Sequence, residues 1–137
     1  MFPVTTRILV VDDFSTMRKV LRKELKALGY TNVDEADDGK TALPMIQEAN
    51  KSGQPYGLII SDWNMPGMKG IDLLQFCRSD EMSSLIPFIM VTSEAEQKNI
   101  VKAAMLGVSD YISKPFNAGT LQVKFEKVWS KIHKEAA

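Results

Sequence analysis

Short apolar segments alternate with longer amphipathic stretches along this sequence, and this alternation limits the folds that the chain can adopt. The apolar segments, interpreted as buried strands, lie at 7–11, 32–36, 58–61, 88–91 and 111–113. Apolar residues recur at helical spacing at 15–28, 40–50, 71–78 and 96–106, and in a last stretch at Leu121, Phe125, Val128, Trp129 and Ile132. Strands that are apolar throughout and are joined by helices pair in parallel, with both faces of the sheet covered. We predict an α/β protein with a doubly wound, five-stranded parallel sheet flanked by five helices.

Length and composition favour a single domain. The 137 residues suit one globular domain, which we expect at residues 7–134 after an N-terminal lead at residues 1–6. Lys plus Arg and Asp plus Glu each number 17, so no net charge attracts nucleic acid or an anionic membrane. The sequence has one cysteine, Cys77, and no long apolar run, which argues against an internal disulfide and against membrane insertion. We expect a cytoplasmic monomer.

Polar residues follow directly on four of the apolar segments. Asp12 and Asp13 come after the first, Asp62 after the third, Thr92 after the fourth and Lys114 after the fifth. The carboxyl ends of parallel strands share one edge of the sheet, and ligands of open α/β sheets bind outside that edge. Three carboxylates, a hydroxyl and an ammonium group are therefore expected to converge there.

The clustered carboxylates indicate a metal site. They repel one another unless a cation compensates, and oxygen ligands without a nearby thiolate or histidine favour Mg²⁺. With Mg²⁺ and Lys114 to neutralise phosphoryl oxygens, an aspartate can act as a nucleophile and form an acyl phosphate. These arguments leave both Asp13 and Asp62 open as the nucleophile. Taken singly, each polar strand end could instead serve a turn, a helix cap or the solvated surface.

Four segments resemble the receiver domains of the CheY type. They are Val10-Val11-Asp12-Asp13-Phe14-Ser15-Thr16-Met17-Arg18, Ser61-Asp62-Trp63-Asn64-Met65-Pro66, Met90-Val91-Thr92 and Lys114-Pro115-Phe116. The resemblance runs from about Arg7 to the last helix, nearly the whole chain. It implies the flavodoxin-like receiver fold. CheY-type proteins are themselves a reference case of the strand-end rule, so the rule and the resemblance are not independent.

The resemblance implies that the cluster takes up a phosphoryl group with the help of Mg²⁺. Asp62 would be the phosphoacceptor. Asp13, Asp62 and the backbone carbonyl of Asn64 would bind Mg²⁺, while Asp12 would hold a metal-bound water. The chain would then promote its own phosphorylation and dephosphorylation as a signalling protein and not act as an enzyme.

The resemblance also implies a switch that responds to the phosphoryl group. Thr92 would donate a hydrogen bond to a phosphoryl oxygen, and Lys114 would pair with the phosphoryl group. Tyr111 would turn inward when Thr92 moves. The Lys114-Pro115 bond would be cis, which is physically allowed because cis bonds are mainly a proline phenomenon.

The implied partners are those of two-component chemotaxis signalling. A CheA-like histidine kinase would supply the phosphoryl group, and a flagellar motor switch protein and a phosphatase would interact with this chain. The sequence favours an external donor, because its one histidine, His133, lies near the end of the last helix among charged residues. A solvated side chain there is a poor internal relay.

The predicted output surface departs from the family pattern. It consists of Glu96, Gln97, Ile100, Tyr111, Ser113 and Lys124. Glu96 and Gln97 stand where lysines are common, and Ser113 stands where an apolar residue is common. Binding to a motor switch protein is therefore less strongly implied than phosphorylation, and a receiver-like module with a non-flagellar output is an alternative.

Two further alternatives make different demands on the sequence. A haloacid-dehalogenase-like phosphatase also uses a strand-end aspartate, a lysine and Mg²⁺, but it needs a second aspartate two places after the nucleophile. Phe14 follows Asp12 at that distance, and Asn64 follows Asp62. A binding module that docks without phosphorylation would have no need of the intact acidic cluster.

Overall fold

A computed structural model describes residues 1–93 and 99–136 of the chain. Strands and helices alternate along these residues. They are β1 Ile8–Val11, α1 Ser15–Ala27, β2 Val33–Ala36, α2 Gly39–Lys51, β3 Leu58–Asp62, α3 Gly70–Ser79, β4 Phe88–Thr92, α4 Ile100–Met105, β5 Asp110–Ser113 and α5 Ala118–Ala136. The predicted elements are confirmed to within a few residues at their ends. The predicted start of the fourth helix, with Glu96 and Gln97, lies outside the described residues.

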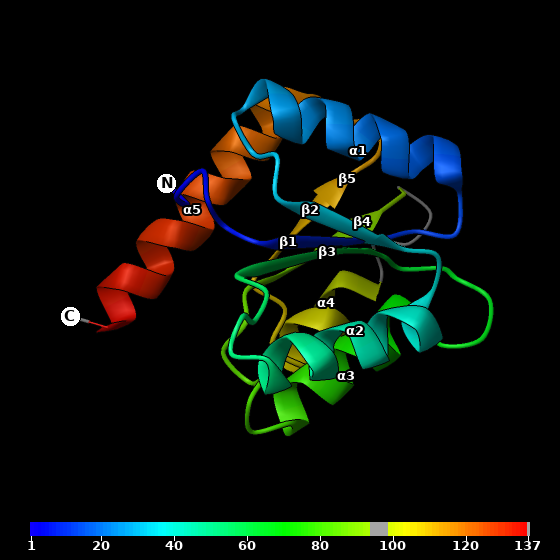
Figure 1. Ribbon diagram of the computed structural model, residues 1–137. Coiled ribbons are helices and arrows are strands. Elements are labelled where there is room, and N and C mark those ends of the chain that lie inside the picture. Colours follow the sequence, from blue (N-terminus) through cyan, green and yellow to red (C-terminus); the bar gives the residue numbers. More distant parts are fainter. Residues whose placement is uncertain (94–98, 137) are drawn as a thin grey trace.

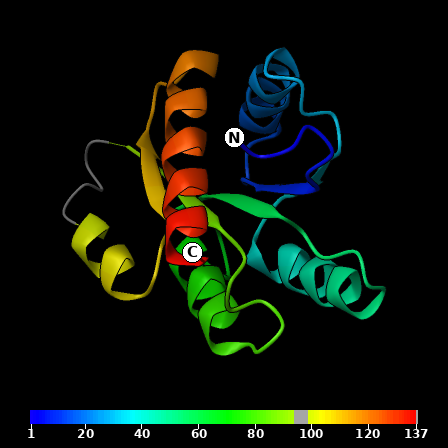
Figure 2. The same ribbon diagram turned by 90° about the vertical axis from the view of Figure 1, so that its left-hand side faces the viewer.

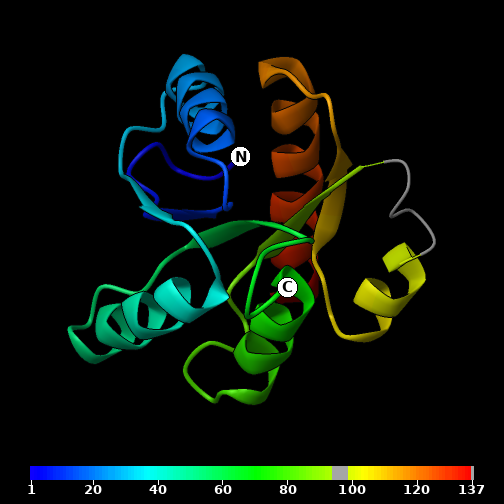
Figure 3. The ribbon, with the colours of Figure 1, turned by 90° about the vertical axis from the view of Figure 1, so that its right-hand side faces the viewer.

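The strands form one parallel sheet in the order β2-β1-β3-β4-β5. In Figure 1, α1 and α5 lie on one face of this sheet, and α2, α3 and α4 lie on the other. Figures 2 and 3 view the molecule from opposite sides, and in both α4 lies toward the β5 edge of the sheet. This arrangement confirms the predicted doubly wound α/β fold with the flavodoxin-like strand order.

Each face of the sheet is buried in its own hydrophobic core. On β1, Leu9 and Val11 point to the core under α2 and α3, whereas Ile8 and Val10 point to the core under α1 and α5. Every residue of β1, β3 and β4 is buried. Burial on both faces explains why these strands are apolar up to their carboxyl ends instead of alternating with polar residues.

The N-terminal lead packs onto the core between α1 and α5. The Phe2 ring lies 5.9 Å from the Phe125 ring and 5.1 Å from the Trp129 ring, measured between centroids. The Tyr30 hydroxyl donates a 2.6 Å hydrogen bond to the Phe2 carbonyl. The lead therefore covers the open end of this core.

No helix in the described part of the chain has both the length and the apolar character needed to cross a membrane.

Candidate functional site

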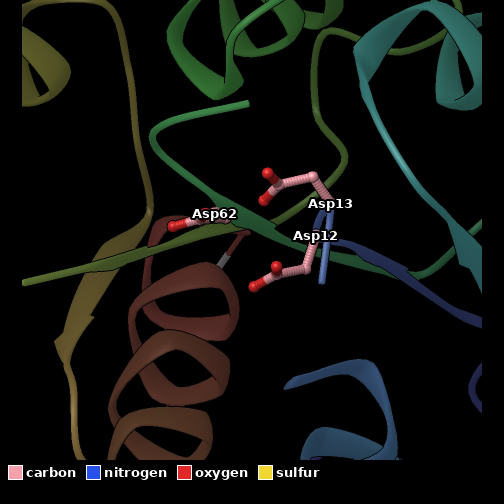
Figure 4. Close-up of side chains that lie close together, drawn as sticks. All are labelled: Asp12, Asp13 and Asp62. Atoms are coloured by element: carbon pink, nitrogen blue, oxygen red, sulfur yellow. The ribbon is translucent and has the colours of Figure 1, made fainter. Parts of the chain in front are cut away.

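The acidic residues predicted to converge meet at the carboxyl end of the sheet. Asp12 directly follows β1, and Asp62 is the last residue of β3, the neighbouring strand. Asp12, Asp13 and Asp62 each offer an oxygen atom within 4.8 Å of those of the other two. Figure 4 shows the three side chains grouped beyond the strand ends. The geometry therefore confirms the predicted acidic cluster.

Two oxygens of the cluster are buried and have no hydrogen-bond partner among the described residues. These atoms are Oδ2 of Asp12 and Oδ1 of Asp13. The other Asp12 oxygen, Oδ1, accepts a 2.9 Å hydrogen bond from the backbone N–H of Phe14. Because buried polar atoms are normally satisfied, two orphaned carboxylate oxygens that face one space fit a bound cation.

Asp12 has a strongly shifted acidity. Burial, first of all, and then the charges of Asp62 and Asp13 raise the pKa of Asp12 from 3.8 to about 6. The Phe14 N–H group and the Lys114 ammonium partly oppose this increase. The cluster therefore resists carrying its full negative charge until a cation compensates for it.

Lys114 approaches the cluster from the end of β5. Its Nζ lies 3.2 Å from Oδ1 of Asp62 and 3.9 Å from Oδ2 of Asp12, and the second distance is beyond a hydrogen bond. The backbone N–H of Trp63 also donates to Oδ1 of Asp62, at 2.9 Å. The Lys114-Pro115 bond is cis, as the resemblance implies. Asp62 thus lies between an ammonium group and a backbone donor.

Thr92 and Tyr111 lie on the strands beyond Asp62. Thr92 ends β4, is 1% exposed and donates a 3.1 Å hydrogen bond to the Ser93 carbonyl. Tyr111 pairs in register with Met90, two positions before Thr92, and packs against the core under α2, α3 and α4. The predicted switch residues therefore lie in a row that leads away from the acidic cluster. Asn64 is exposed, in the loop after β3.

Two residues that support the cluster were missed by the sequence analysis. Arg18 donates from Nη1 to the Asp12 carbonyl at 2.6 Å and from Nε to Glu35 at 3.0 Å, and so secures the turn after β1. A Cβ atom on Gly70 would overlap the Asp62 carbonyl, so only glycine lets α3 begin this close to β3. Neither contact has a sequence signal, because each joins residues whose separation follows no period.

Three comparisons relate this chain to known proteins. The model of the response regulator receiver domain matches residues 8–126. The chain is 48% identical over 127 residues to "Chemotaxis protein CheY" of Pseudomonas aeruginosa, covering 93% of this chain and 98% of that protein. It is 47% identical over 126 residues to "Chemotaxis protein CheY-3" of Vibrio cholerae, covering 92% of this chain and 93% of that one.

Solved structures with the same fold agree with these sequence matches. The chemotaxis response regulator CheY4 of Vibrio cholerae superimposes with a TM-score of 0.79 at 31% identity, covering 90% of this chain and 98% of that structure. A putative response regulator from Chloroflexus aurantiacus gives a TM-score of 0.82 at 25% identity, covering 92% and 98%. The likeness extends over nearly the whole of each chain.

Proposed function

The chain belongs to the response regulator receiver domain family as a CheY-type receiver of chemotaxis signalling, and we propose that Asp62 is its phosphoacceptor. One observation carries this proposal: the Asp62 carboxylate, in contact with the Lys114 ammonium, lies beside two carboxylates with orphaned buried oxygens. This arrangement places a nucleophile next to a cation and a metal site.

The geometry favours Asp62 over its two neighbours as the nucleophile. Nζ of Lys114 lies 3.2 Å from Oδ1 of Asp62 but 3.9 Å from Oδ2 of Asp12, so the ammonium group is closer to Asp62. Among the described residues, Lys114 forms ion pairs with Asp12 and Asp62 and not with Asp13. The charge that balances an incoming phosphoryl group is thus concentrated at Asp62.

The cluster fits Mg²⁺, which would neutralise phosphoryl oxygens when bound. Asp12, Asp13 and Asp62 supply hard carboxylate oxygens, and we assign the backbone carbonyl of Asn64 as a further ligand on the family resemblance. No described thiolate or imidazole belongs to the cluster, which disfavours zinc and copper.

Phosphoryl transfer from a kinase phosphohistidine needs one bond exchange. An Asp62 carboxylate oxygen bonds to phosphorus as the bond from phosphorus to the imidazole nitrogen breaks, and the imidazole leaves with the electron pair. Lys114 pairs with a phosphoryl oxygen of the product. The Thr92 hydroxyl, now bonded to the Ser93 carbonyl, can turn to the more strongly attractive phosphoryl oxygen. Hydrolysis of the acyl phosphate returns the chain to its starting state.

The proposed output is a change in the surface around β5. Ile100, Tyr111, Ser113 and Lys124 of the predicted surface are described, whereas Glu96 and Gln97 are not. A hydroxyl that gains a charged acceptor only after phosphorylation shifts a two-state equilibrium, and Tyr111 is the residue proposed to follow it. The proposed partners are a CheA-like kinase and, on the output side, a flagellar motor switch protein.

Transfer of label from a CheA-like kinase that carries labelled phosphohistidine tests this function. Label should move to this chain when Mg²⁺ is present and should remain on the kinase when a chelator removes it, because the uncompensated acidic cluster repels the phosphoryl group. The measurement is the label on each separated protein. Equal transfer with and without Mg²⁺, or none in either case, would contradict the proposal.

Magnesium affinity should depend on Asp13. Replacing Asp13 with asparagine should weaken Mg²⁺ binding by about tenfold or more, because one charged ligand becomes neutral. Trp63, which is buried beside Asp62, reports the binding through its fluorescence. Asp37→Asn is the matched control, since the Asp37 carboxylate is exposed, accepts a hydrogen bond from Thr41 and is not a member of the acidic cluster.

A second control separates the two tryptophans of the sequence. Trp63→Phe should remove the fluorescence change, because Trp129 packs against Phe2 and His133 on the other face of the sheet. If Asp13→Asn binds Mg²⁺ as tightly as the parent protein does, the ligand assignment is wrong.

A further inference from the structure

Strand β5 begins with a buried carboxylate, Asp110, which is 9% exposed and immediately precedes Tyr111. Two lysines of α5 compensate its charge. Nζ of Lys124 lies 3.2 Å from one oxygen, and Nζ of Lys127 lies 3.8 Å from the other. A buried carboxylate is unfavourable without such partners, so it constrains where those ammonium groups lie.

The ammonium group of Lys124 also covers the ring of Tyr111. It lies 4.7 Å from the ring centroid, within the range of a cation–π interaction. The Lys124 side chain is 23% exposed, whereas that of Lys127 is 71% exposed. Lys124 therefore bridges the Asp110 carboxylate and the Tyr111 ring in a partly desolvated position, and Lys127 contributes less.

We propose that Asp110 is a positioning residue that acts through Lys124 to hold Tyr111 in the orientation seen here and so opposes the switch. The inference rests on the proposed function, in which Tyr111 moves after phosphorylation. If the ring turns away, it loses the ammonium group that Asp110 fixes above it. Contacts present in one state and lost in the other shift the equilibrium toward the first state.

The ion pair between Lys124 and Asp110 also reduces the net positive charge of the output surface. While Asp110 neutralises Lys124, an acidic partner meets less attraction there. Movement of Tyr111 would remove one of the two contacts that keep the lysine in place. Asp110 therefore couples the orientation of Tyr111 to the charge that α5 presents.

Two substitutions remove this contact without removing bulk. Asp110→Asn keeps an oxygen for the Tyr111 N–H group, which now donates to Oδ1 of Asp110 at 2.7 Å, but loses the attraction for Lys124. Lys124→Met keeps the apolar stem and loses the ammonium group. Glu126→Gln is the matched control for Asp110→Asn, because it makes the same charge change at an exposed position of α5.

The orientation of the Tyr111 ring can be measured without any phosphate mimic. In protein labelled with fluorotyrosine, Asp110→Asn and Lys124→Met should each shift or split the ¹⁹F resonance of Tyr111, which Tyr111→Phe identifies. Lys124→Arg, which keeps a cation over the ring, should leave the resonance near its parent position. If the Tyr111 resonance has the same position in Asp110→Asn, in Lys124→Met and in the control Glu126→Gln, the inference is overturned.

The phosphate mimic beryllofluoride tests the effect on the switch. Asp110→Asn and Lys124→Met should each lower the apparent Kd of the mimic by about threefold to tenfold, because less free energy opposes the active state. The double variant Asp110→Asn, Lys124→Met should bind the mimic little more tightly than either single variant, since both substitutions remove the same contact. Unchanged affinity in both variants would overturn the inference.

The two proposals fail in different ways. If beryllofluoride leaves the Tyr111 resonance of the parent protein unchanged, the proposed function fails as a switch. The mimic-free ¹⁹F spectra still decide whether Asp110 positions Tyr111.

Discussion

Replacing Asp62 with asparagine should reduce phosphoryl uptake from a histidine kinase to background, a loss on the order of a thousandfold or more. An amide is not a nucleophile toward phosphorus, whereas the shape of the side chain is kept. The amide oxygen can still accept from the Trp63 N–H group, now 2.9 Å from Oδ1 of Asp62. The variant should therefore fold and still fail to take label, which is measured as protein-bound phosphate after incubation with labelled kinase.

The chemistry of the label provides the control. Label on the parent protein should be released by hydroxylamine, because it is an acyl phosphate. His133 is the histidine of this sequence, and it lies exposed on α5 with Nδ1 3.0 Å from the Trp129 carbonyl. Label that persists in Asp62→Asn, or that maps to His133, would show that the phosphoacceptor has been assigned wrongly. Asp37→Asn should take label normally.

The fold and the acidic cluster could be predicted because both depend on regular patterns. Burial on both faces makes most of β1, β3 and β4 apolar, and parallel pairing brings the polar residues at their carboxyl ends to one edge. Asp12, Asp62 and Lys114 were predicted to converge from these two facts alone, and they do. Physical reasoning did not choose between Asp13 and Asp62, because that choice depends on which carboxylate Lys114 contacts.

The remaining contacts depend on side chains that meet across the fold. Phe2 was assigned to the N-terminal lead outside the domain, yet it is buried in the core against Phe125. Lys124 was predicted on the output surface, and the structure further places it against Asp110 and Tyr111. The periodic pattern of apolar residues does not predict such contacts, because they form only when complete helices pack on the sheet.

Asp12 should make the metal-free protein less stable as the pH rises. Its pKa in the folded protein is about 6, above the ordinary 3.8, so between these values the folded state holds more protons than the unfolded state. Stability falls with increasing pH wherever the folded state holds the extra proton. The unfavourable contribution of Asp12 should thus grow from about pH 4 to about pH 6 and stay constant above.

Replacing Asp12 with asparagine should therefore stabilise the metal-free protein at neutral pH. The increase in the free energy of unfolding should be about 2 to 3 kcal/mol above pH 6, because each tenfold change in proton affinity corresponds to about 1.4 kcal/mol. Asparagine keeps an oxygen for the Phe14 N–H group, so the turn after β1 should be retained. Urea unfolding in the presence of a chelator, at pH 4 and at pH 7.5, measures the difference, which should be small at the lower pH.

Magnesium should reduce the difference in stability between the two proteins, because the ion compensates for the charge that makes Asp12 unfavourable. At an Mg²⁺ concentration of about 100 times the Kd, the parent protein should gain about 2.7 kcal/mol, and Asp12→Asn should gain less because it binds the ion more weakly. Asp37→Asn, which removes an exposed carboxylate, should change the stability far less at pH 7.5. If Asp12→Asn is no more stable than the parent without metal at pH 7.5, the Asp12 carboxylate does not destabilise the metal-free protein as its raised pKa implies. A metal-dependent phosphoacceptor needs an acidic cluster that is unfavourable when empty and favourable when Mg²⁺ is bound. Binding of the ion relieves the unfavourable free energy of the empty cluster, and this relief favours binding.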